Sequence, residues 1–500
     1  MESLEKNKYF ILPQPKYINI SKDNGMTLSS LLTIFLSKHS IKDNALLLSS
    51  KFQKHFNTFL NTIPIRDSAL DDRLGENYYF AIITTELNYE IHVQRLLKEL
   101  LKTHVSQFDE ILHDCCYHYF PDIMESSLPL NEAYYIDISD GSIWILSQSV
   151  RGFYSGIQSL LQIIEHTLFL FDKFEEFIIL PRMRIVDFSG WKTRGFSVNL
   201  NFFKPSTKAL NELIPFLAKY KINLLLLYQE SGFPESEENK KIIHDLCKFH
   251  QIDLAITTDF EKIPKKTLQQ VQYSTSSRFI IPDYCSIFDK IMDTNIKQRT
   301  FMNGILVSAS KNEFYLLDLL LLAIPIIAEL IWNPQTPYSH DKLKFLSDAT
   351  QVNVFENNIL TQNMDLLRIF QSTSSDIQNI SFIYTILGQA RKNAFENTQL
   401  IEVLEWAFRL LELERALNEI RKSIKSNENP KSVTTQVIEQ FQQYSNEFIT
   451  LKSIGLKILE GSNRVEKGEY EKFFNSSGYP LKSLVETWIP EITRDQHINY

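Results

Sequence analysis

Residues 181–203 read PRMRIVDFSGWKTRGFSVNLNFF, and residues 219–228 read KYKINLLLLY. Within them, residues 194–200 have the pattern of a half-buried strand, and residues 222–228 form a nearly continuous apolar run, typical of a parallel sheet that is buried on both faces. Between the two strands, apolar residues recur at i, i+3, i+4 and i+7, as on one face of a helix: Leu210, Leu213, Ile214 and Leu217. The stretch therefore predicts a βαβ unit.

The totals indicate an ordinary globular protein. A chain of 500 residues predicts two to four domains. The net charge of -8, with no long basic run, argues against nucleic acid or an anionic membrane as a partner. Four cysteines do not make a disulfide framework, and MESLEKNKYF at the N-terminus has no apolar signal-peptide core. We expect a reduced, cytoplasmic protein without a cofactor.

One apolar stretch has the length of a membrane span. Residues 314–332 read FYLLDLLLLAIPIIAELIW and include Asp318, Pro325 and Glu329. Charged residues inside a span are costly, so this stretch favours a buried helix of a large domain.

The pattern of elements predicts three parts of the α/β class. Residues 1–180 form a small α/β domain with helices inserted at residues 88–130. Residues 181–345 form a reduced or incomplete (β/α) barrel of the TIM type, and residues 346–500 form an all-α domain.

The expected elements of the first part include a hairpin over residues 134–146, turning at Asp140 and Gly141. A helical pair is expected within 88–130 and a helix over 151–164. Three further strands are expected at residues 10–20, 45–49 and 78–84.

The barrel shows five strands where eight are needed. They are expected at residues 194–200, 222–228, 253–257, 278–281 and 304–308. One long helix, over residues 313–331, follows the last of them.

Three segments resemble known enzymes in the same order along the chain. They are ILPQPKYINI (11–20), YYIDISDGSIWILSQSVRGFYSGIQSLLQII (134–164), and the run from GILVS at 304–308 to IWNP at 331–334. Together with the βαβ unit, they resemble β-N-acetylhexosaminidases of glycoside hydrolase families 20 and 84, the latter being the O-GlcNAcase-like group. The resemblance implies a small α/β domain before a catalytic barrel and, in family 84, a helical domain after it.

The resemblance also implies a substrate-assisted mechanism, in which the acetamide oxygen of the sugar attacks its own anomeric carbon. Two carboxyl groups are still needed, one to orient the acetamide and one to protonate the leaving oxygen. The family carries them as an adjacent pair after strand 4. This sequence has adjacent pairs only elsewhere: Asp71-Asp72, Asp109-Glu110, Glu175-Glu176 and Glu237-Glu238.

Five residues are the candidates for a site. Asp259 follows strand 3 and is the best-placed acid, and Asp283 resembles a sugar-binding Asp after strand 7. Arg194 matches the Arg that begins strand 1, where it either binds sugar hydroxyls or makes a structural ion pair. Tyr228, where the family has a sugar-binding Lys nearby, and Ser308, which aligns with a sugar-binding Asn, complete the substrate-binding set.

A metal site is not predicted. The run HDCCYH at residues 113–118 matches no standard zinc spacing, and on a helix its side chains point in several directions. A buried helix face is the simpler interpretation.

Three functions stay open. The first is a glycoside-hydrolase-like protein with impaired catalysis that binds an N-acetylglucosamine-containing glycan or a protein partner. The second is an active β-N-acetylhexosaminidase that uses Asp259 or Asp283, and the third is a structural scaffold. An enzyme needs two carboxyl groups at the mouth of the barrel, whereas a scaffold is expected to have a mouth filled by apolar side chains. The sequence predicts no oligomeric state.

Overall fold

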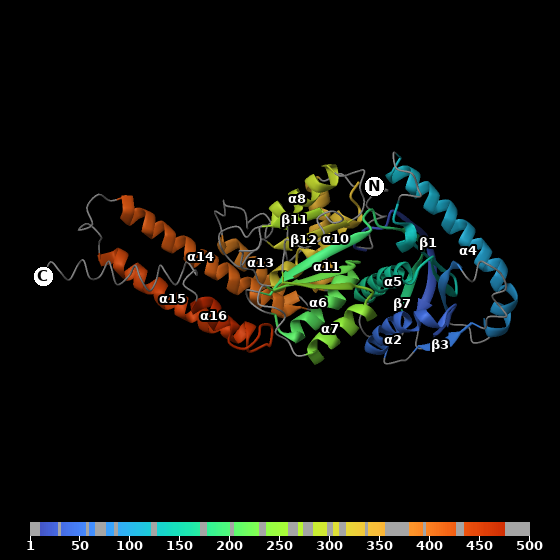
Figure 1. Ribbon diagram of the computed structural model, residues 1–500, viewed down its shortest axis with the longest axis horizontal. Coiled ribbons are helices and arrows are strands. Elements are labelled where there is room, and N and C mark those ends of the chain that lie inside the picture. The colour runs from blue at the N-terminus through green and yellow to red at the C-terminus, as the bar shows by residue number, and fades with distance from the viewer. Residues whose placement is uncertain are drawn as a thin grey trace.

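The computed structural model describes residues 11–28, 32–56, 60–65, 77–84, 89–121, 128–170, 178–200, 205–229, 237–258, 269–273, 284–297, 304–309, 317–335, 339–355, 380–393, 397–426 and 435–475. These residues form a mostly antiparallel sheet, a parallel sheet beside it, and long helices beyond (Figure 1). The fold is therefore mixed α/β, as predicted.

The first sheet has seven described strands in the order β1-β7-β5-β6-β4-β2-β3. All neighbours are antiparallel except β2 and β3. The hairpin β5–β6 forms as predicted, with Gly141 at a φ of +77° that favours glycine. The strands are β1 (Tyr17–Leu28), β2 (Thr33–Leu36), β3 (Asn61–Pro64), β4 (Tyr79–Thr84), β5 (Tyr134–Ser139), β6 (Ser142–Ser147) and β7 (Ile178–Asp187).

Helices cover both faces of this sheet because its strands alternate apolar side chains between two cores. On β5, Ile136 packs with α2 (Lys42–Phe56) and α5 (Val150–Leu170), whereas Tyr135 packs under α4 (Tyr89–Tyr119). Figure 1 shows α4 and α5 on opposite sides of the sheet.

Two expectations for this part were wrong in detail, and a third is described only in part. Residues 45–49 lie inside α2, because Ala45, Leu48 and Phe52 repeat at helical spacing and are buried. Within 88–130, where a helical pair was predicted, the described residues include one α-helix of 31 residues, α4, and residues 122–127 lie outside the described part of the chain. The first strand begins at Tyr17 rather than at residue 10.

The second sheet has five described strands, all parallel, in the order β10-β9-β8-β12-β11. They are β8 (Thr193–Asn199), β9 (Leu224–Tyr228), β10 (Asp253–Thr257), β11 (Gln269–Tyr273) and β12 (Gly304–Ala309). The helices between them are α6 (Thr207–Lys219), α7 (Glu237–Phe249) and α8 (Tyr284–Lys297). The predicted βαβ unit is β8, α6 and β9.

Four of the five predicted strands of this part are present. The fifth, expected at residues 278–281, lies outside the described residues. The structure also has β11, which was not predicted because its sequence QQVQY is too polar to be recognised as a buried strand.

Two matching turns lead back into the sheet. Lys221 after α6 and Gln251 after α7 have positive φ values of 61° and 57°. In each turn the next residue donates its amide to a carbonyl five residues back, Ile222 to Leu217 and Ile252 to Cys247. This geometry ends a helix sharply and normally favours glycine. The turn after α6 places Lys221 and Asn223 just before β9 begins, and the turn after α7 leads into β10.

The remaining described residues are helical. The helices are α9 (Leu317–Leu321), α10 (Ile324–Trp332), α11 (His340–Phe355), α13 (Ile380–Asn393), α14 (Thr398–Ser426), α15 (Thr435–Leu459) and α16 (Glu469–Asn475). The single helix expected over 313–331 is two, since the chain turns at residues 322–323 and Pro325 sits in the first turn of α10. Every residue of α10 is buried, and among the described residues no helix has the length and apolarity of a membrane span.

Two features bear on how the parts join. One hydrophobic core runs from the parallel sheet through α10 into α13, α14 and α15. The expected boundary between residues 180 and 181 falls inside β7, which pairs with β1 and β5 in the first sheet. Figure 1 shows α14 and α15 side by side, extending away from both sheets.

Candidate functional site

The carboxyl ends of parallel strands are where α/β folds most often place a ligand. At that edge Asn199 of β8 is in register with Tyr228 of β9, which is in register with Thr257 of β10. All three side chains are neutral. The amide of Asn199 and the hydroxyls of Tyr228 and Thr257 can form hydrogen bonds, but none of these three residues carries a carboxylate.

Tyr228 and Ser308, both predicted to bind sugar, are buried in the structure. Tyr228 is 1% exposed and packs with Leu226 and Leu306 in a small apolar cluster on one face of the sheet. Ser308 of β12 is 0% exposed and in register with Gln272 of β11. A ligand would reach either side chain only after a rearrangement, so their sugar-binding role stays a prediction.

The two candidate acids, Asp259 and Asp283, lie outside the described residues. In the chain, Asp259 comes two residues after the end of β10, and Asp283 directly precedes α8. Their catalytic role stays a prediction.

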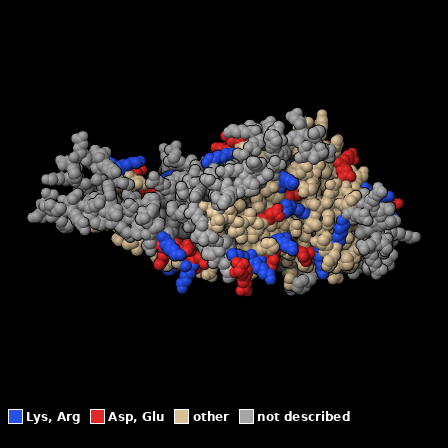
Figure 2. Space-filling view, viewed as in Figure 1, with Lys and Arg blue, Asp and Glu red and all other residues tan. Residues whose placement is uncertain are grey.

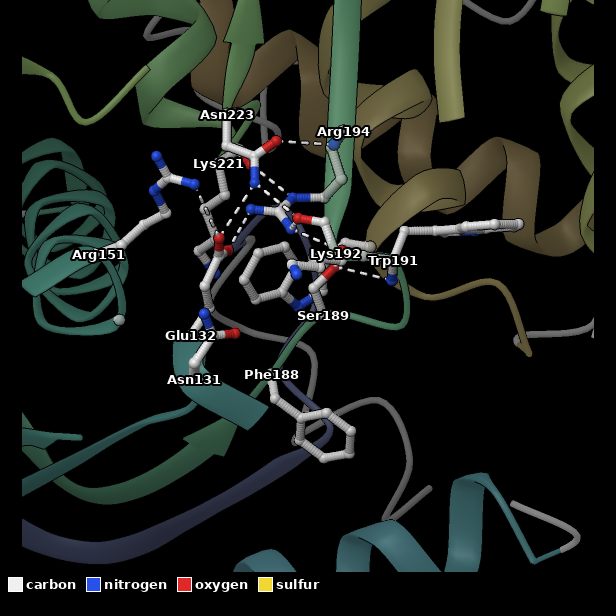
Figure 3. A network of polar contacts seen from close by, with 12 residues as sticks. Asn131, Glu132, Arg151, Phe188, Ser189, Trp191, Lys192, Arg194, Lys221 and Asn223 are labelled. Carbon is white, nitrogen blue, oxygen red and sulfur yellow. Dashed lines mark hydrogen bonds and ion pairs between the residues drawn. The ribbon is translucent and has the colours of Figure 1, made fainter. Parts of the chain in front are cut away.

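Arg194 lies at the opposite, amino-terminal end of the sheet, in a buried polar network (Figure 3). Its guanidinium forms an ion pair with Glu132, and it donates to the carbonyl oxygens of Lys221 at 2.9 Å and Trp191 at 2.7 Å. It also lies 4.8 Å from the ring centre of Trp332. Burial lowers the pKa of Arg194, and the Glu132 carboxylate opposes that shift.

Glu132 holds the two sheets together at this point. It lies in the short helical turn η4 (Leu130–Glu132), just before β5. Its second oxygen accepts from Asn223 at 3.0 Å, and Asn223 in turn accepts from the Arg194 amide at 2.7 Å. Arg151 of α5 lies 3.7 Å from Glu132 (Figure 3). Arg151 also donates to the exposed Asp253 at 2.9 Å. Of the two roles predicted for Arg194, sugar binding or a structural ion pair, these contacts are the ones that an ion pair requires.

Asp187, at the end of β7, is the centre of the adjoining part of this network. Its carboxylate accepts from Tyr134 Oη and Trp332 Nε1, both at 2.9 Å, and from Lys221 Nζ at 3.2 Å. Lys16 Nζ lies 3.8 Å away. Two fully buried lysines therefore share one fully buried carboxylate.

Burial determines the titration of these lysines. It lowers the pKa of Lys16 to about 8, although Asp187 and Glu329 act in the opposite direction. Burial likewise lowers the pKa of Lys221. A lysine with a lowered pKa is a common feature of catalytic sites, but here the ammonium groups are already engaged by protein oxygens. Lys16 donates to the carbonyl oxygen of Phe188 and to Asn333 Oδ1, the latter at 2.8 Å.

The network as a whole joins structural elements, and the sugar-binding role of Arg194 stays a prediction. Its residues come from the first sheet, the parallel sheet and α10, and they meet at the amino-terminal end of the parallel strands. Polar residues at that end of such a sheet generally serve stability. Sequence analysis missed Glu132, Asp187 and Lys221; the signal in the sequence was, for Asp187 and Lys221 only, a charge between apolar or aromatic residues.

The His and Cys residues of α4 point in different directions, as expected for a helix. Cys115 and Cys116 are buried in the core under α4, whereas His113 and His118 are exposed. Burial raises the pKa of Cys115 to about 11. In the part of the chain that is described, no three His, Cys, Asp or Glu side chains come together as metal ligands.

The described charged residues on one face of the molecule do not gather into a patch of one sign. On the face shown in Figure 2, the described Lys and Arg side chains are interspersed with Asp and Glu. A mixed surface of this kind is the usual one for a protein in water.

Of the comparisons with known proteins, only the one with solved structures found matches. The sequence matches no protein-family model. A search of curated proteins found no match. Among solved structures, a family 20 exo-β-N-acetylglucosaminidase from Vibrio harveyi has a TM-score of 0.31 at 13% identity, covering 77% of this chain and 53% of that one. This chain thus spans about half the length of that enzyme chain.

Two further neighbours match over most of both chains. The Flavobacterium johnsoniae chitobiase has a TM-score of 0.35 at 10% identity, covering 97% of this chain and 99% of that one. The protein CpGH84B has a TM-score of 0.42 at 12% identity, covering 96% and 99%. The structural neighbours are thus family 20 and family 84 proteins, at TM-scores that carry no argument about activity.

Proposed function

We propose that this chain is a glycoside-hydrolase-like protein that does not hydrolyse glycosides and acts by binding a partner. The observation that supports the proposal most is the row Asn199, Tyr228 and Thr257 at the carboxyl ends of β8, β9 and β10. Glycoside hydrolysis needs a carboxyl group to protonate the leaving oxygen. Neutral amides and hydroxyls can hold a ligand but cannot supply that proton at neutral pH.

The acids at the other end of the sheet agree with this proposal. Glu132 is engaged with Arg194, and Asp253, at the start of β10, is engaged with Arg151. Neither carboxylate is positioned at the carboxyl ends of the strands. The burial of Tyr228 beside Leu226 is also the packing expected of a non-catalytic protein.

Hydrolysis of a fluorogenic N-acetyl-β-glucosaminide by the purified full chain tests the proposal. We expect no turnover above a blank from folded protein, and no difference in the Asp259→Ala and Asp283→Ala variants. Turnover that either substitution abolishes would refute the proposal and identify an acid. Turnover that neither substitution changes would refute it as well and place the acid elsewhere.

A titration separates the two kinds of partner. N-acetylglucosamine and its β-linked dimer, added to the wild-type chain in a calorimeter, give heat if the bound partner is a glycan. Absence of heat, together with absence of turnover, argues against these sugars as ligands and leaves a protein partner or a structural scaffold as the remaining roles.

A further inference from the structure

Helix α4 packs on the first sheet through an apolar face that includes one histidine. Leu101, Val105 and Phe108 of this face are buried in the core between α4 and the sheet. His104 lies on the same face: its side chain is 12% exposed, and its ring centre is 4.4 Å from that of Trp144 on β6. The imidazole is thus largely shielded from water, and burial disfavours the charged form of a side chain.

Hydrogen bonds determine where the neutral His104 ring carries its hydrogen. His104 Nδ1 lies 3.3 Å from Tyr135 Oη, which donates to Gln107 Oε1 at 3.1 Å. Burial raises the pKa of Tyr135, so the phenol keeps its hydrogen and directs it to Gln107. Tyr135 Oη therefore accepts from His104 Nδ1, and Nε2 is the nitrogen that takes up a second proton.

The carboxylate beside His104 is already paired. Asp137 of β5 has one oxygen 4.0 Å from His104 Nδ1, which is too long for a hydrogen bond between charged groups. Its other oxygen accepts from Arg184 Nε of β7 at 3.0 Å. Tyr17 of β1 is close enough to Arg184 to interact with it electrostatically. A proton on His104 would therefore add a second positive charge next to a carboxylate that Arg184 already neutralises.

These surroundings fix the direction of the pH effect. Burial lowers the pKa of His104 below its ordinary value of 6.5, Asp137 acts in the opposite direction, and Arg184 lowers the pKa further. The folded protein thus binds this proton less readily than the unfolded chain does. Because the folded-state pKa is the lower one, the stabilisation is complete above pH 6.5 and is lost as the pH falls below it.

We infer that His104 is a proton-sensitive contact that weakens the attachment of α4 to the first sheet in mild acid. The apolar residues around His104 keep α4 in place, so the quantity that changes is how often the helix opens. Each opening, local or global, brings the imidazole into water, where it takes up a proton. The inference does not depend on the proposed function, because it concerns the opposite face of the first sheet from α5 and needs no ligand.

Hydrogen exchange on the full chain tests the inference. The amides of residues 97–108 are followed at about pH 7.5 and about pH 5.5, with the chemical exchange rate corrected for pH. In wild type we expect opening to be up to about tenfold more frequent at the lower pH, the limit for one pH unit below an ordinary histidine pKa. His104→Gln should lack this part of the response. The matched control is His118→Gln, at an exposed position on the same helix, which should respond as wild type does.

A second substitution guards against loss of the fold. His104→Phe keeps an aromatic ring against Trp144 but cannot take up a proton. We expect the exchange of its α4 amides to be as insensitive to acid as that of His104→Gln. Carbon-13 NMR of labelled histidine follows the wild-type ring directly, and we expect the His104 signal, identified by its loss in either variant, to titrate below pH 6.5.

The opposite results would overturn the inference. A cation against the face of a Trp ring is stabilised by the π-electrons. If that attraction exceeds the cost of burial, His104 titrates above pH 6.5 and α4 opens less often in acid. Equal acid responses of wild type, His104→Gln and His104→Phe would also overturn it, because the response would then come from other groups.

Discussion

Arg194 and Glu132 form an ion pair in which the side chains are 2% and 3% exposed. One belongs to the first strand of the parallel sheet and the other to the turn that leads into β5 of the first sheet. The pair therefore joins the two sheets through an interior that excludes water, where an unpaired charge is far costlier than at the surface.

Replacing Glu132 by Gln is expected to lower the free energy of unfolding by about 3–5 kcal/mol, because it leaves the Arg194 charge buried without an anion. The measurement is the urea unfolding midpoint at pH 7. Asp253→Asn is the control, since it removes the exposed partner of Arg151 and should cost no more than about 1 kcal/mol. Equal losses of unfolding free energy in the two variants would show that burial of the Arg194–Glu132 ion pair does not increase its contribution to stability.

The Asp187→Asn variant should be destabilised to a similar extent. The substitution keeps the shape of the side chain but removes the negative charge that Lys16 and Lys221 share, at a cost of about 3–5 kcal/mol. Tyr134→Phe removes one hydroxyl bonded to the same carboxylate and should cost only about 1–3 kcal/mol. Thermal unfolding of both variants checks this order, and a larger loss in Tyr134→Phe would contradict it.

Glu165 of α5 predicts how stability depends on acid pH. Burial would raise its pKa, but Lys219 and Lys51 outweigh that effect and lower the pKa from 4.5 to about 2. Because the folded-state pKa is the lower one, the stabilisation is complete above pH 4.5 and is lost as the pH falls from 4.5 towards 2. It amounts to about 3 kcal/mol.

The matching variant is Glu165→Gln, measured by urea unfolding at several pH values between 7 and 2.5. We expect it to be less stable than wild type at pH 7 and to lose less on acidification through this window. Glu402→Gln, at an exposed position on α14, should follow the wild-type curve. A Glu165→Gln curve parallel to wild type at every pH would exclude the Glu165 ion pairs as the cause.

Two helical glycines should respond to alanine in opposite ways. A Cβ at Gly455 of α15 would lie 2.3 Å from Tyr470 Oη and 2.6 Å from Trp406, so Gly455→Ala should destabilise by about 1–3 kcal/mol. A Cβ at Gly388 of α13 meets nothing within 4 Å, so Gly388→Ala should stabilise by about 0.5–1 kcal/mol through helix propensity. The melting temperatures of both variants test this prediction. A melting temperature of Gly388→Ala below that of wild type would contradict it.

Local patterns predicted local structure. The Asp140-Gly141 turn and the apolar run into Tyr228 each fix one conformation through residues close in sequence, and both predicted elements are present. Residues 45–49 were misassigned because a short apolar run fits a strand and a helix equally well until the spacing to Phe52 is considered. β11 was missed because its register with β12, and not its own polar sequence, makes it a strand.

The polar network could not be predicted in the same way. Arg194 was recognised as important, but its partner Glu132 precedes it by 62 positions, and Trp332 follows by more than 130. The choice between a sugar ligand and an ion pair depended on those distant partners. For Asp259 and Asp283 the sequence supplied a place in the chain, and their role remains a prediction.

The strand β7 has a practical consequence for dividing this protein. A fragment that ends at residue 180 would keep only the first three residues of β7. Strands β1 and β5, which both pair with β7, would then lose most of their hydrogen-bonded partner strand. A fragment extended to Asp187 would complete the sheet but would carry a carboxylate whose partners Trp332 and Lys221 stay on the other piece. The first sheet and the parallel sheet are therefore not separable modules, and neither half is expected to be stable when expressed alone.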